Sequence, residues 1–356
     1  MEIDHTPTTD RPKPKRRWFY PTPERLLVVL LVVVGLLLLS EQWFPKGWAV
    51  LIAVAAVGLF LLSMLIWFIV SLFFHWHFQF SIRSLLVLTV AFAIPSSWLA
   101  VQMKWAKEQK EAVEAIRELG EGVRYDYQFN ASGRIRPGME PAGPAWLRNL
   151  LGIDFFCNVT AISSREKNVS NTELEHLKGL TQLQSLNFGD SQIADAGLEY
   201  LEGLIHLQDL DLSVNKITGD GLVYLKGMSQ LQTLKLNETE VTDARLIYLK
   251  GLTQIRMLDI RGNRITDNGL EHIRGLTQLQ ELWLADNQIT DAGLAHLTAM
   301  TCLKWLDLSN TKITDAGLEL LKGLKKLEKL DLSHTKVTAA GVNDLQNTLP
   351  NLTIYQ

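Results

Sequence analysis

The sequence predicts an α/β solenoid, with a strand, a turn and a helix in each repeat, preceded by transmembrane α-helices. Two observations indicate the solenoid. Residues 153–344 divide into eight copies of 24 residues without insertion or deletion, and apolar residues recur at fixed places in each copy. A third observation indicates membrane segments, because residues 26–103 are almost free of charge.

The order of elements within a repeat follows from the spacing of the apolar columns. Leu258 and Ile260 are two residues apart, which places both on one face of a short strand. Leu270 and Ile273 are three apart, which is typical of a helix stripe. Between the strand and the helix, Asn263 can satisfy backbone groups of a buried turn, and Thr266 suits a helix N-cap.

Three apolar stretches, at about 26–44, 47–74 and 84–103, are predicted to cross a membrane. A span needs about 20 apolar residues, and the second stretch has no ionisable residue over its length. The first is short and relies on flanking aromatic residues, and the third contains Pro95. The alternative of a cleaved signal peptide is disfavoured, because two more apolar stretches follow the first and no small-residue cleavage site intervenes.

Basic residues in the tail 1–25 indicate a cytoplasmic N-terminus. Three crossings then place the repeats outside the cytoplasm, whereas two crossings would leave them inside. Residues 104–152 are predicted as a juxtamembrane helix and an N-terminal cap, and residues 345–356 as a C-terminal cap. The helix is expected to turn Trp105, Ala112, Ile116 and Leu119 to one face. The residues from Val123 to Phe129 are expected to alternate as a half-buried strand. A short helix is expected over 146–151.

The lines LQELWLADNQITDAGL (279–294) and LKWLDLSNTKITDAGL (303–318) resemble the leucine-rich repeat family. The ITDAGL ending is similar to the subclass related to ribonuclease inhibitor and the cysteine-containing repeats. The whole layout resembles bacterial membrane-anchored leucine-rich-repeat proteins. This resemblance implies a curved solenoid with strands on its concave side, a bacterial inner-membrane location and protein binding. The first copy departs from the pattern at Ser164 and Lys167.

Among the strand positions expected to face outward, the large apolar side chains are Met257, Trp283 and Trp305. Aromatic residues on an open surface are typical binding anchors, so they predict a site for a protein or peptide ligand, flanked by Asp259 and Asp307. The alternative is that the two rings only cover neighbouring apolar surface. The acidic column to which these aspartates belong suits a solvated strand face as well as a Ca²⁺ site.

The sequence gives no indication of catalysis, because it lacks G-x-S-x-G, H-E-x-x-H, C-x-x-C and a phosphate-binding glycine loop. We therefore expect no enzyme, no cofactor and no metal, and a net charge of −3 does not suggest a nucleic-acid partner. Cys157 and Cys302 are expected to be free and buried. The leading hypothesis is a non-enzymatic, membrane-anchored recognition protein, and the alternative is an envelope scaffold that self-associates through the solenoid.

Overall fold

The computed structural model describes residues 58, 62, 82–118, 122–129, 138–163 and 169–356. Residues 1–102 and 103–356 form two separate units. The predicted tail, and all but two residues of the predicted spans 26–44 and 47–74, lie outside the described residues. So does the stretch 164–168, which holds the departures from the pattern in the first copy.

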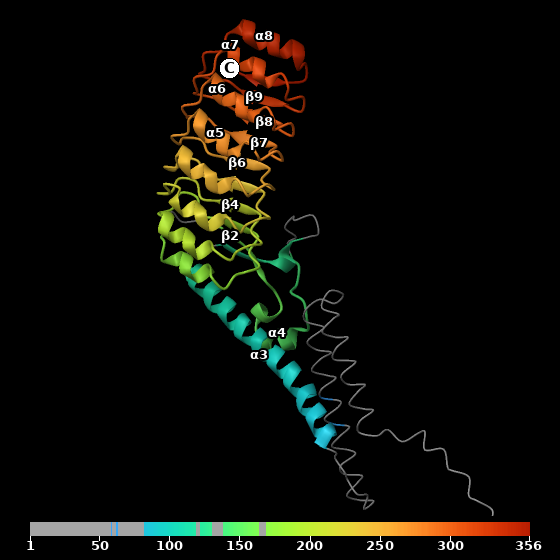
Figure 1. Ribbon diagram of the computed structural model, residues 1–356. Helices are drawn as coiled ribbons and strands as arrows, with labels where there is room; N and C mark the ends of the chain where they lie inside the picture. Colours follow the sequence, from blue (N-terminus) through green and yellow to red (C-terminus); the bar gives the residue numbers. More distant parts are fainter. Residues whose placement is uncertain (1–57, 59–61, 63–81, 119–121, 130–137, 164–168) are drawn as a thin grey trace, which may run out of the picture. The chain divides into compact units, whose positions relative to one another are not determined.

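One ten-stranded sheet runs through the described part of the repeat region, and its strands follow one another in sequence order (Figure 1). The strands β1 and β2 are antiparallel, and all later neighbours are parallel. Leu258 pairs with Leu282, 24 residues further on, and every parallel pair keeps this offset. The strands are β1 (Gly122–Tyr125), β2 (Val159–Ser163), β3 (Ser185–Asn187), β4 (Asp209–Asp211), β5 (Thr233–Lys235), β6 (Met257–Asp259), β7 (Glu281–Trp283), β8 (Trp305–Asp307), β9 (Lys329–Asp331) and β10 (Thr353–Tyr355).

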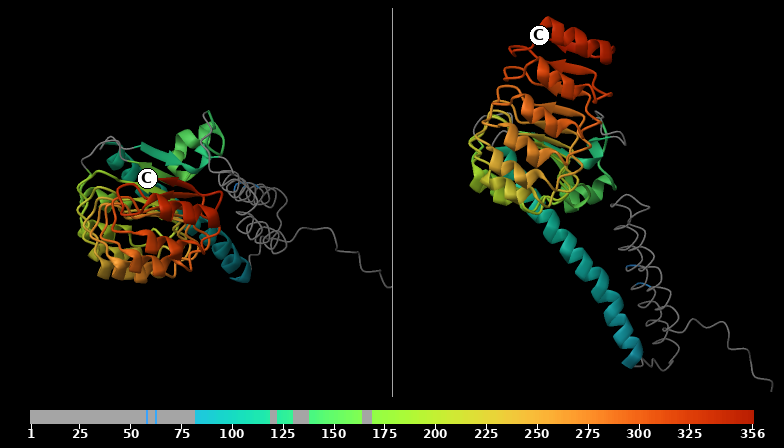
Figure 2. Two further views of the ribbon diagram at one scale, coloured as in Figure 1. Left: turned by 90° about the horizontal axis from the view of Figure 1, so that it is seen from above. Right: turned by 45° about the horizontal axis from the view of Figure 1, so that its top comes forward.

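A short helix follows each repeat strand on the other side of the core, so that strands and helices form two stacked layers (Figures 1 and 2). The first four are 3₁₀ helices and the later ones are α-helical, namely η4 (Glu173–Leu177), η5 (Asp195–Leu201), η6 (Asp220–Leu225), η7 (Asp243–Leu249), α5 (Asp267–Ile273), α6 (Asp291–Leu294) with η8 (Ala295–Leu297), α7 (Asp315–Leu321) and α8 (Ala339–Thr348). Apolar residues three apart fit both types, because a 3₁₀ helix has 3.0 residues per turn and an α-helix 3.6. The apolar spacing therefore predicts helices without deciding their type.

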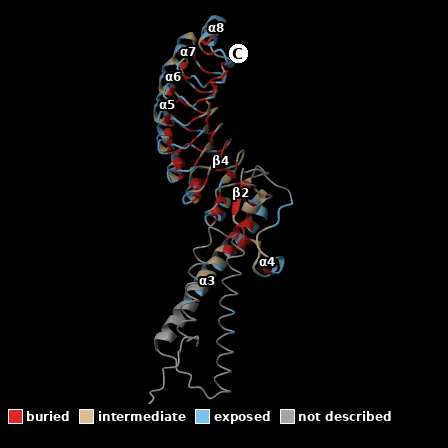
Figure 3. Ribbon diagram, turned by 90° about the vertical axis from the view of Figure 1, so that its right-hand side faces the viewer, coloured by how far each residue is buried: buried red, intermediate tan, exposed pale blue. Residues whose placement is uncertain are grey.

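The core lies between the two layers, where the recurrent leucines and isoleucines are buried (Figure 3). Leu258, Ile260, Leu270 and Ile273 are fully buried, as the column pattern predicts. Val337, in the last copy, is only half-buried. The strands line the inner side of the curve of the repeats, and the helices line its outer side (Figure 3).

Helix α3 (Ile82–Glu118) joins the third predicted span and the predicted juxtamembrane helix into one helix that continues through Pro95. Among the described residues, no helix combines the length and the apolar character needed to cross a membrane. In the second half of α3, the buried residues include Ala106, Gln109, Val113 and Ile116. The predicted face was thus only partly correct: Ala112 and Ile116 are buried, but Trp105 is only half-buried, and Leu119 lies outside the described residues.

The buried face of α3 differs from the predicted apolar face because it includes Gln109, whose polar side chain is almost fully buried. Its Nε2 donates to the Cys157 carbonyl at 2.8 Å and to the Asp154 carboxylate at 3.2 Å, and its Oε1 accepts from the Val159 N–H at 3.2 Å. The Tyr125 hydroxyl donates to the same Asp154 carboxylate at 2.9 Å. One amide therefore fixes α3 to the segment that leads into β2, which is a role that apolar patterning does not reveal.

Among the described residues between β1 and β2 are three short helices, namely η2 (Asp126–Gln128), α4 (Ala145–Leu151) and η3 (Ile153–Phe155). Helix α4 matches the prediction of a short helix over 146–151. The predicted strand from Val123 to Phe129 was too long, because the strand stops at Tyr125. There the Gln128 side chain accepts from the Tyr125 N–H at 2.8 Å and closes a 3₁₀ turn.

Buried asparagines hold the turns of adjacent repeats together, as the recurrent polar residue predicts. Asn263 donates from Nδ2 to the carbonyls of Leu236, Ile260 and Arg261 at 2.9–3.1 Å. Its Oδ1 accepts from the Val241 N–H at 3.0 Å. Leu236 and Val241 belong to the preceding repeat, so the side chain satisfies buried backbone groups of two repeats at once.

Aspartate and threonine form a second ladder at the helix starts. Asp243 accepts from the N–H and the hydroxyl of Thr266, at 2.8 and 2.6 Å, although the two residues lie in adjacent repeats. The Thr266 hydroxyl also accepts from the Asn268 N–H at 3.3 Å and so caps its own helix. The same contacts join Asp267 to Thr290 and Asp291 to Thr314.

The glycine of the ITDAGL ending is explained by this ladder. A Cβ at Gly269 would collide with the Asp243 carboxylate, and Gly293 and Gly317 face the aspartate of the preceding repeat in the same way. One repeat has Arg245 in place of this glycine. The residue that faces it is Gly219 instead of aspartate, and the Arg245 guanidinium pairs with Asp220 at 2.6 Å. The two exceptions therefore compensate for each other.

Candidate recognition surface

The predicted site lies on the strand side of the repeats. Met257 begins β6, Trp283 ends β7 and Trp305 begins β8, and all three side chains are half-buried. Pairing places Trp305 opposite Glu281, and Trp283 opposite Asp259 and Asp307. The five predicted residues therefore lie on three adjacent strands.

The two tryptophans contact each other directly. Their ring centroids are 4.6 Å apart with an angle of 36° between the planes, a tilted arrangement within the range that aromatic pairs favour. The register of β7 and β8 makes the two residues diagonal neighbours, and side chains as large as tryptophan span the distance of about 7–8 Å between such positions. The sequence prediction of adjacent strands is confirmed at this point.

A cation closes each end of this aromatic pair. The Arg261 guanidinium lies 4.3 Å from the centroid of Trp283, and the Lys329 ammonium lies 4.6 Å from the centroid of Trp305. Such contacts contribute about 0.5–1 kcal/mol at exposed positions. We call the four residues Arg261, Trp283, Trp305 and Lys329 the ring stack. Sequence reasoning missed both cations, although Lys329 occupies the column of Trp305 in the next repeat.

Asp259 and Asp307 were expected to be exposed, and this expectation was wrong, because both are buried. Each accepts hydrogen bonds from the residue two places further on. Asp259 binds the Arg261 guanidinium at 2.6 and 2.9 Å, and Asp307 binds the N–H and hydroxyl of Ser309 at 3.0 and 2.7 Å. The carboxylates therefore fold back at the strand ends instead of facing solvent.

The bond to Asp259 also fixes Arg261 electrostatically. Hydrogen bonding to Asp259 raises the pKa of the Arg261 guanidinium above its ordinary value, against the opposing effect of burial. The same guanidinium covers Trp283, so the carboxylate positions the cation on the ring. The Trp283 Nε1 is buried without a hydrogen-bond partner in the described part of the chain. The ring faces are thus occupied within the protein, and a partner would contact the ring edges and the cations.

A column of Tyr and His residues occupies the helix side of the repeats. Tyr200 and Tyr248 are half-buried, and the ammonium groups of Lys178 and Lys226 lie 4.6 and 4.9 Å from their ring centroids. In each pair the lysine lies 22 residues before the tyrosine, directly after the preceding helix. Within the described residues, no three His, Cys, Asp or Glu side chains are placed to hold a metal ion.

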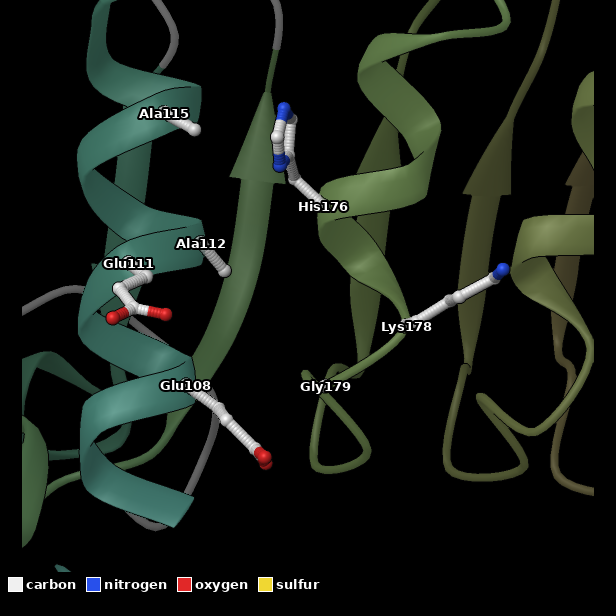
Figure 4. A pocket seen from close by; sticks show the side chains of 7 residues that line it. All are labelled: Glu108, Glu111, Ala112, Ala115, His176, Lys178 and Gly179. Carbon is white, nitrogen blue, oxygen red and sulfur yellow. The ribbon is translucent and has the colours of Figure 1, made fainter. Parts of the chain in front are cut away.

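An open cleft of about 560 Å³ separates α3 from η4 (Figure 4). Glu108, Glu111, Ala112 and Ala115 line it on the α3 side, and His176, Lys178 and Gly179 line it on the repeat side. Figure 4 shows the Lys178 side chain pointing away from α3, and its ammonium lies over Tyr200. The acidic side of the cleft therefore has no lysine facing it from this position.

The two cysteines are free. Cys157 is buried as predicted. Burial, and to a smaller extent the nearby Asp126 carboxylate, raises the pKa of its thiol to about 12. The prediction that Cys302 is buried was wrong. It is half-buried, because it lies in the turn between helix and strand and not in an apolar column, and Lys326 Nζ is 4.0 Å from its sulfur.

Family models match most of this repeated region. The model described as "Leucine rich repeat" matches residues 205–265 and 277–337, and a second of that description matches 179–201. A model described as "Leucine Rich repeats (2 copies)" matches 253–296. The repeats are leucine-rich repeats. The ring stack therefore lies on the parallel-strand face of a leucine-rich-repeat solenoid.

Solved structures with similar repeats come from bacteria and plants. Internalin C2 from Listeria monocytogenes is 27% identical over 55% of this chain and 80% of its own, with a TM-score of 0.46. A leucine-rich-repeat protein from Leptospira interrogans is 18% identical over 51% of each chain, with a TM-score of 0.39. The plant peptide hormone receptor RGFR1, in complex with RGF2, is 19% identical over 51% of this chain and 29% of its own, with a TM-score of 0.37. No curated protein sequence matches the chain.

Proposed function

We propose that this chain is a non-enzymatic recognition protein, anchored in a bacterial inner membrane, whose leucine-rich repeats bind a protein or peptide on their strand face. The observation that carries the proposal is the ring stack. It places two half-buried tryptophans side by side on a face whose other strand positions are mostly small or polar.

The ring stack is suited to binding because it is held in place before a partner arrives. Arg261 is fixed by Asp259 and in turn covers Trp283, while Lys329 covers Trp305. Side chains that are already ordered lose less entropy on binding, and buried tryptophan and arginine dominate the energy of many protein interfaces. Met257, one strand before Trp283, extends the apolar surface.

The dimensions of the face favour a protein or peptide over a small molecule. Parallel strands from β2 to β10 lie side by side, which at about 4.8 Å per strand gives a face about 40 Å long. A surface of that length matches the footprint of a protein interface, whereas small molecules bind in enclosed pockets.

We further propose that the three apolar stretches anchor the chain and that the repeats lie outside the cytoplasm. The support is the sequence itself, with apolar stretches at 26–44, 47–74 and 84–103 and a basic tail before them. We also assign the repeats to the ribonuclease-inhibitor-like subclass on their ITDAGL endings.

The test is affinity capture of a partner on the full chain, followed by measurement of Kd for single variants. Trp305→Ala is expected to weaken binding by about thirtyfold, which corresponds to about 2 kcal/mol at an interface hot spot. Trp283→Ala should weaken binding by a similar factor, because the two rings contact each other. Thr233→Ala, on the same face three strands from Trp305, should leave Kd unchanged.

The control for stability is Tyr248→Ala on the helix side. Tyr248 is also a half-buried ring beneath a lysine, so its removal costs comparable packing without altering the strand face. Loss of affinity in the tryptophan variants but not in Tyr248→Ala, at a similar fall in Tm, supports recognition by the strand face. Equal affinity in all variants would show that the rings serve packing and that the partner binds elsewhere.

A further inference from the structure

The strand face of the solenoid carries more acidic than basic side chains. The positions on this face are the first and third residues of β3 to β9 and the second residue after each of these strands. Six of the residues there are acidic and three are basic, which gives the face a net charge of −3, namely Asp209, Asp211, Asp259, Glu281, Asp307 and Asp331 against Lys235, Arg261 and Lys329. A surface with this balance attracts a positively charged partner.

The three basic side chains are already engaged within the protein. Lys235 Nζ lies 3.3 Å from the Asp211 carboxylate, and the Arg261 guanidinium binds Asp259. The Lys329 ammonium lies over the ring of Trp305. The remaining four carboxylates form no ion pair in the part of the chain that the structure describes, and they belong to Asp209, Glu281, Asp307 and Asp331. Their negative charge is therefore available to a partner.

Two of these carboxylates flank the tryptophan pair. On β7 and β8, Glu281 is opposite Trp305, and Trp283 is opposite Asp307. The rings thus occupy one diagonal of this group of four residues, and the carboxylates occupy the other. Because the ring centroids are only 4.6 Å apart, the rings lie between the two carboxylates. A negative group is therefore placed on each side of the aromatic contact.

Asp331 adds a second carboxylate on the β8 side. Its partner in β8 is Asp307, and like charges directly opposite each other destabilise a sheet. Both accept hydrogen bonds from neutral donors, since Asp307 binds Ser309 and Asp331 accepts from the Ser333 N–H at 2.9 Å. Among the described residues, no three His, Cys, Asp or Glu side chains are placed to hold a metal ion. The arrangement therefore suits an organic cation, which one or two carboxylates can bind.

We propose that the segment bound by the strand face is basic, with one Lys or Arg side chain against Glu281 and another against Asp307 and Asp331, on the two sides of the tryptophan pair. This inference rests on the recognition role proposed above and adds the chemistry of the partner. Lysine and arginine suit both parts of this surface, because their aliphatic stems pack on apolar side chains while their charged groups reach a carboxylate. Arginine also binds a carboxylate through two parallel hydrogen bonds.

The experiment selects twelve-residue peptides from a random library displayed on phage, with the full chain in non-ionic detergent as the target. Only peptides that lose affinity for Trp305→Ala are kept, so that binding elsewhere on the chain does not count. The Kd of a kept peptide is then measured by fluorescence anisotropy for the wild type, Glu281→Gln and Asp331→Asn. Both substitutions remove a charge and keep the size of the side chain, and the amide oxygen in Asp331→Asn can still accept from the Ser333 N–H.

The matched control is Asp209→Asn. Asp209 is an exposed carboxylate on the same face, but it lies in β4, three strands before β7. Its removal changes the net charge of the face by the same amount without touching the surroundings of the rings. The control therefore separates cations that sit beside the tryptophans from a general attraction to the acidic face.

We expect the kept peptides to be richer in Lys and Arg than the unselected library. Glu281→Gln and Asp331→Asn should each weaken Kd roughly tenfold, as the loss of a hydrogen bond between charged groups does. Asp209→Asn should change Kd by less than about twofold. When one Arg of the peptide is replaced by neutral citrulline, or one Lys by norleucine, one of the two substitutions in the chain should lose its effect, because that pair is already broken.

Kept peptides without an excess of Lys and Arg would overturn the inference and leave the recognition role intact. Equal Kd values for the wild type, Glu281→Gln and Asp331→Asn would do the same, as would an equally large loss in Asp209→Asn. If no binding peptide depends on Trp305, recognition by the strand face fails, and the inference fails with it. Sedimentation of the chain without peptide tests another occupant: self-association that Glu281→Gln abolishes would show that a second copy fills the face, and would overturn the inference.

Discussion

At the scale of single residues, each of the seven repeats whose turn the structure describes places one residue in the left-handed backbone region, directly before the polar residue of the turn. The residues with positive φ at this position are Asp190, Val214, Glu238, Gly262, Asp286, Asn310 and His334. Val214, with a φ of 55°, is the β-branched member of this set. A left-handed conformation costs an L-residue roughly 1–2 kcal/mol, and a branched Cβ is the least suited to it.

Val214→Asn is therefore expected to stabilise the chain by about 1 kcal/mol, because asparagine tolerates the left-handed region. Val214 is partly exposed, so little apolar burial is lost. The matched control is Ile205→Asn, which makes a similar polar change in an exposed turn and should alter stability by less than about 0.5 kcal/mol. Chemical denaturation gives the free energy of unfolding of each variant. Equal changes in this free energy for the two substitutions would contradict strain at Val214.

The candidate site shows what can be predicted at this scale. Alternation along the strands correctly placed Trp283 and Trp305 on one face, because side chains on a strand point to opposite sides in turn. It failed for Asp259 and Asp307, since burial there depends on hydrogen bonds at the strand end to Arg261 and Ser309. Periodicity gives the side of the sheet on which a residue lies, but not whether its side chain folds back.

At the scale of elements, the helix starts depend on the neighbouring repeat. The Thr of the ITDAGL ending was predicted to cap its own helix. The threonine does cap its helix, as Thr266 shows. The aspartate accepts from the threonine of the next repeat, and this contact spans 23 residues, which a reading of one helix at a time does not detect.

Gly269→Ala is expected to destabilise the chain by about 1–3 kcal/mol, because the new methyl group would overlap the Asp243 carboxylate. The sign is informative, since Gly→Ala in a helix ordinarily stabilises by about 0.5–1 kcal/mol. Denaturant titration gives the free energy of unfolding.

Two further variants decide the cause. Gly275→Ala is the matched control, because a Cβ there meets no atom within 4 Å, and it should not destabilise. Removing the carboxylate as well, in Asp243→Ala with Gly269→Ala, should recover part of the loss. If Gly269→Ala alone were as stable as Gly275→Ala, the overlap would not limit this position.

At the scale of the whole molecule, stability is shared between neighbouring repeats. The sheet joins each repeat to the next, and the asparagine and aspartate–threonine ladders add hydrogen bonds between several neighbouring repeats. The 24-residue period was sufficient to predict the order and direction of the parallel strands, because a solenoid stacks its repeats in sequence order. The antiparallel β1 and the docking of α3 by Gln109 lie outside the period and could not be predicted from it.

Leu258→Asp tests this coupling. Leu258 is fully buried in the middle of the sheet, and a buried unpaired carboxylate costs several kcal/mol. Hydrogen exchange should accelerate in β5 and β7 as well as in β6, because each repeat depends on its neighbours. Leu258→Met, which keeps an apolar side chain of similar volume, should leave exchange in β5 and β7 nearly unchanged. Acceleration confined to β6 would argue against coupling.

The Gly219–Arg245 pair limits how the array can gain or lose repeats. In this chain, each aspartate at this position faces a glycine of the next repeat. If the repeat that holds Arg245 were duplicated alone, the arginine of the second copy would face Asp243 of the first copy. The carboxylate and the arginine side chain would then compete for one space. If the repeat with Gly219 were lost alone, Arg245 would face Asp195 in the same way. The repeat with Arg245 therefore cannot be duplicated alone, and the repeat with Gly219 cannot be lost alone, without placing an arginine against an aspartate.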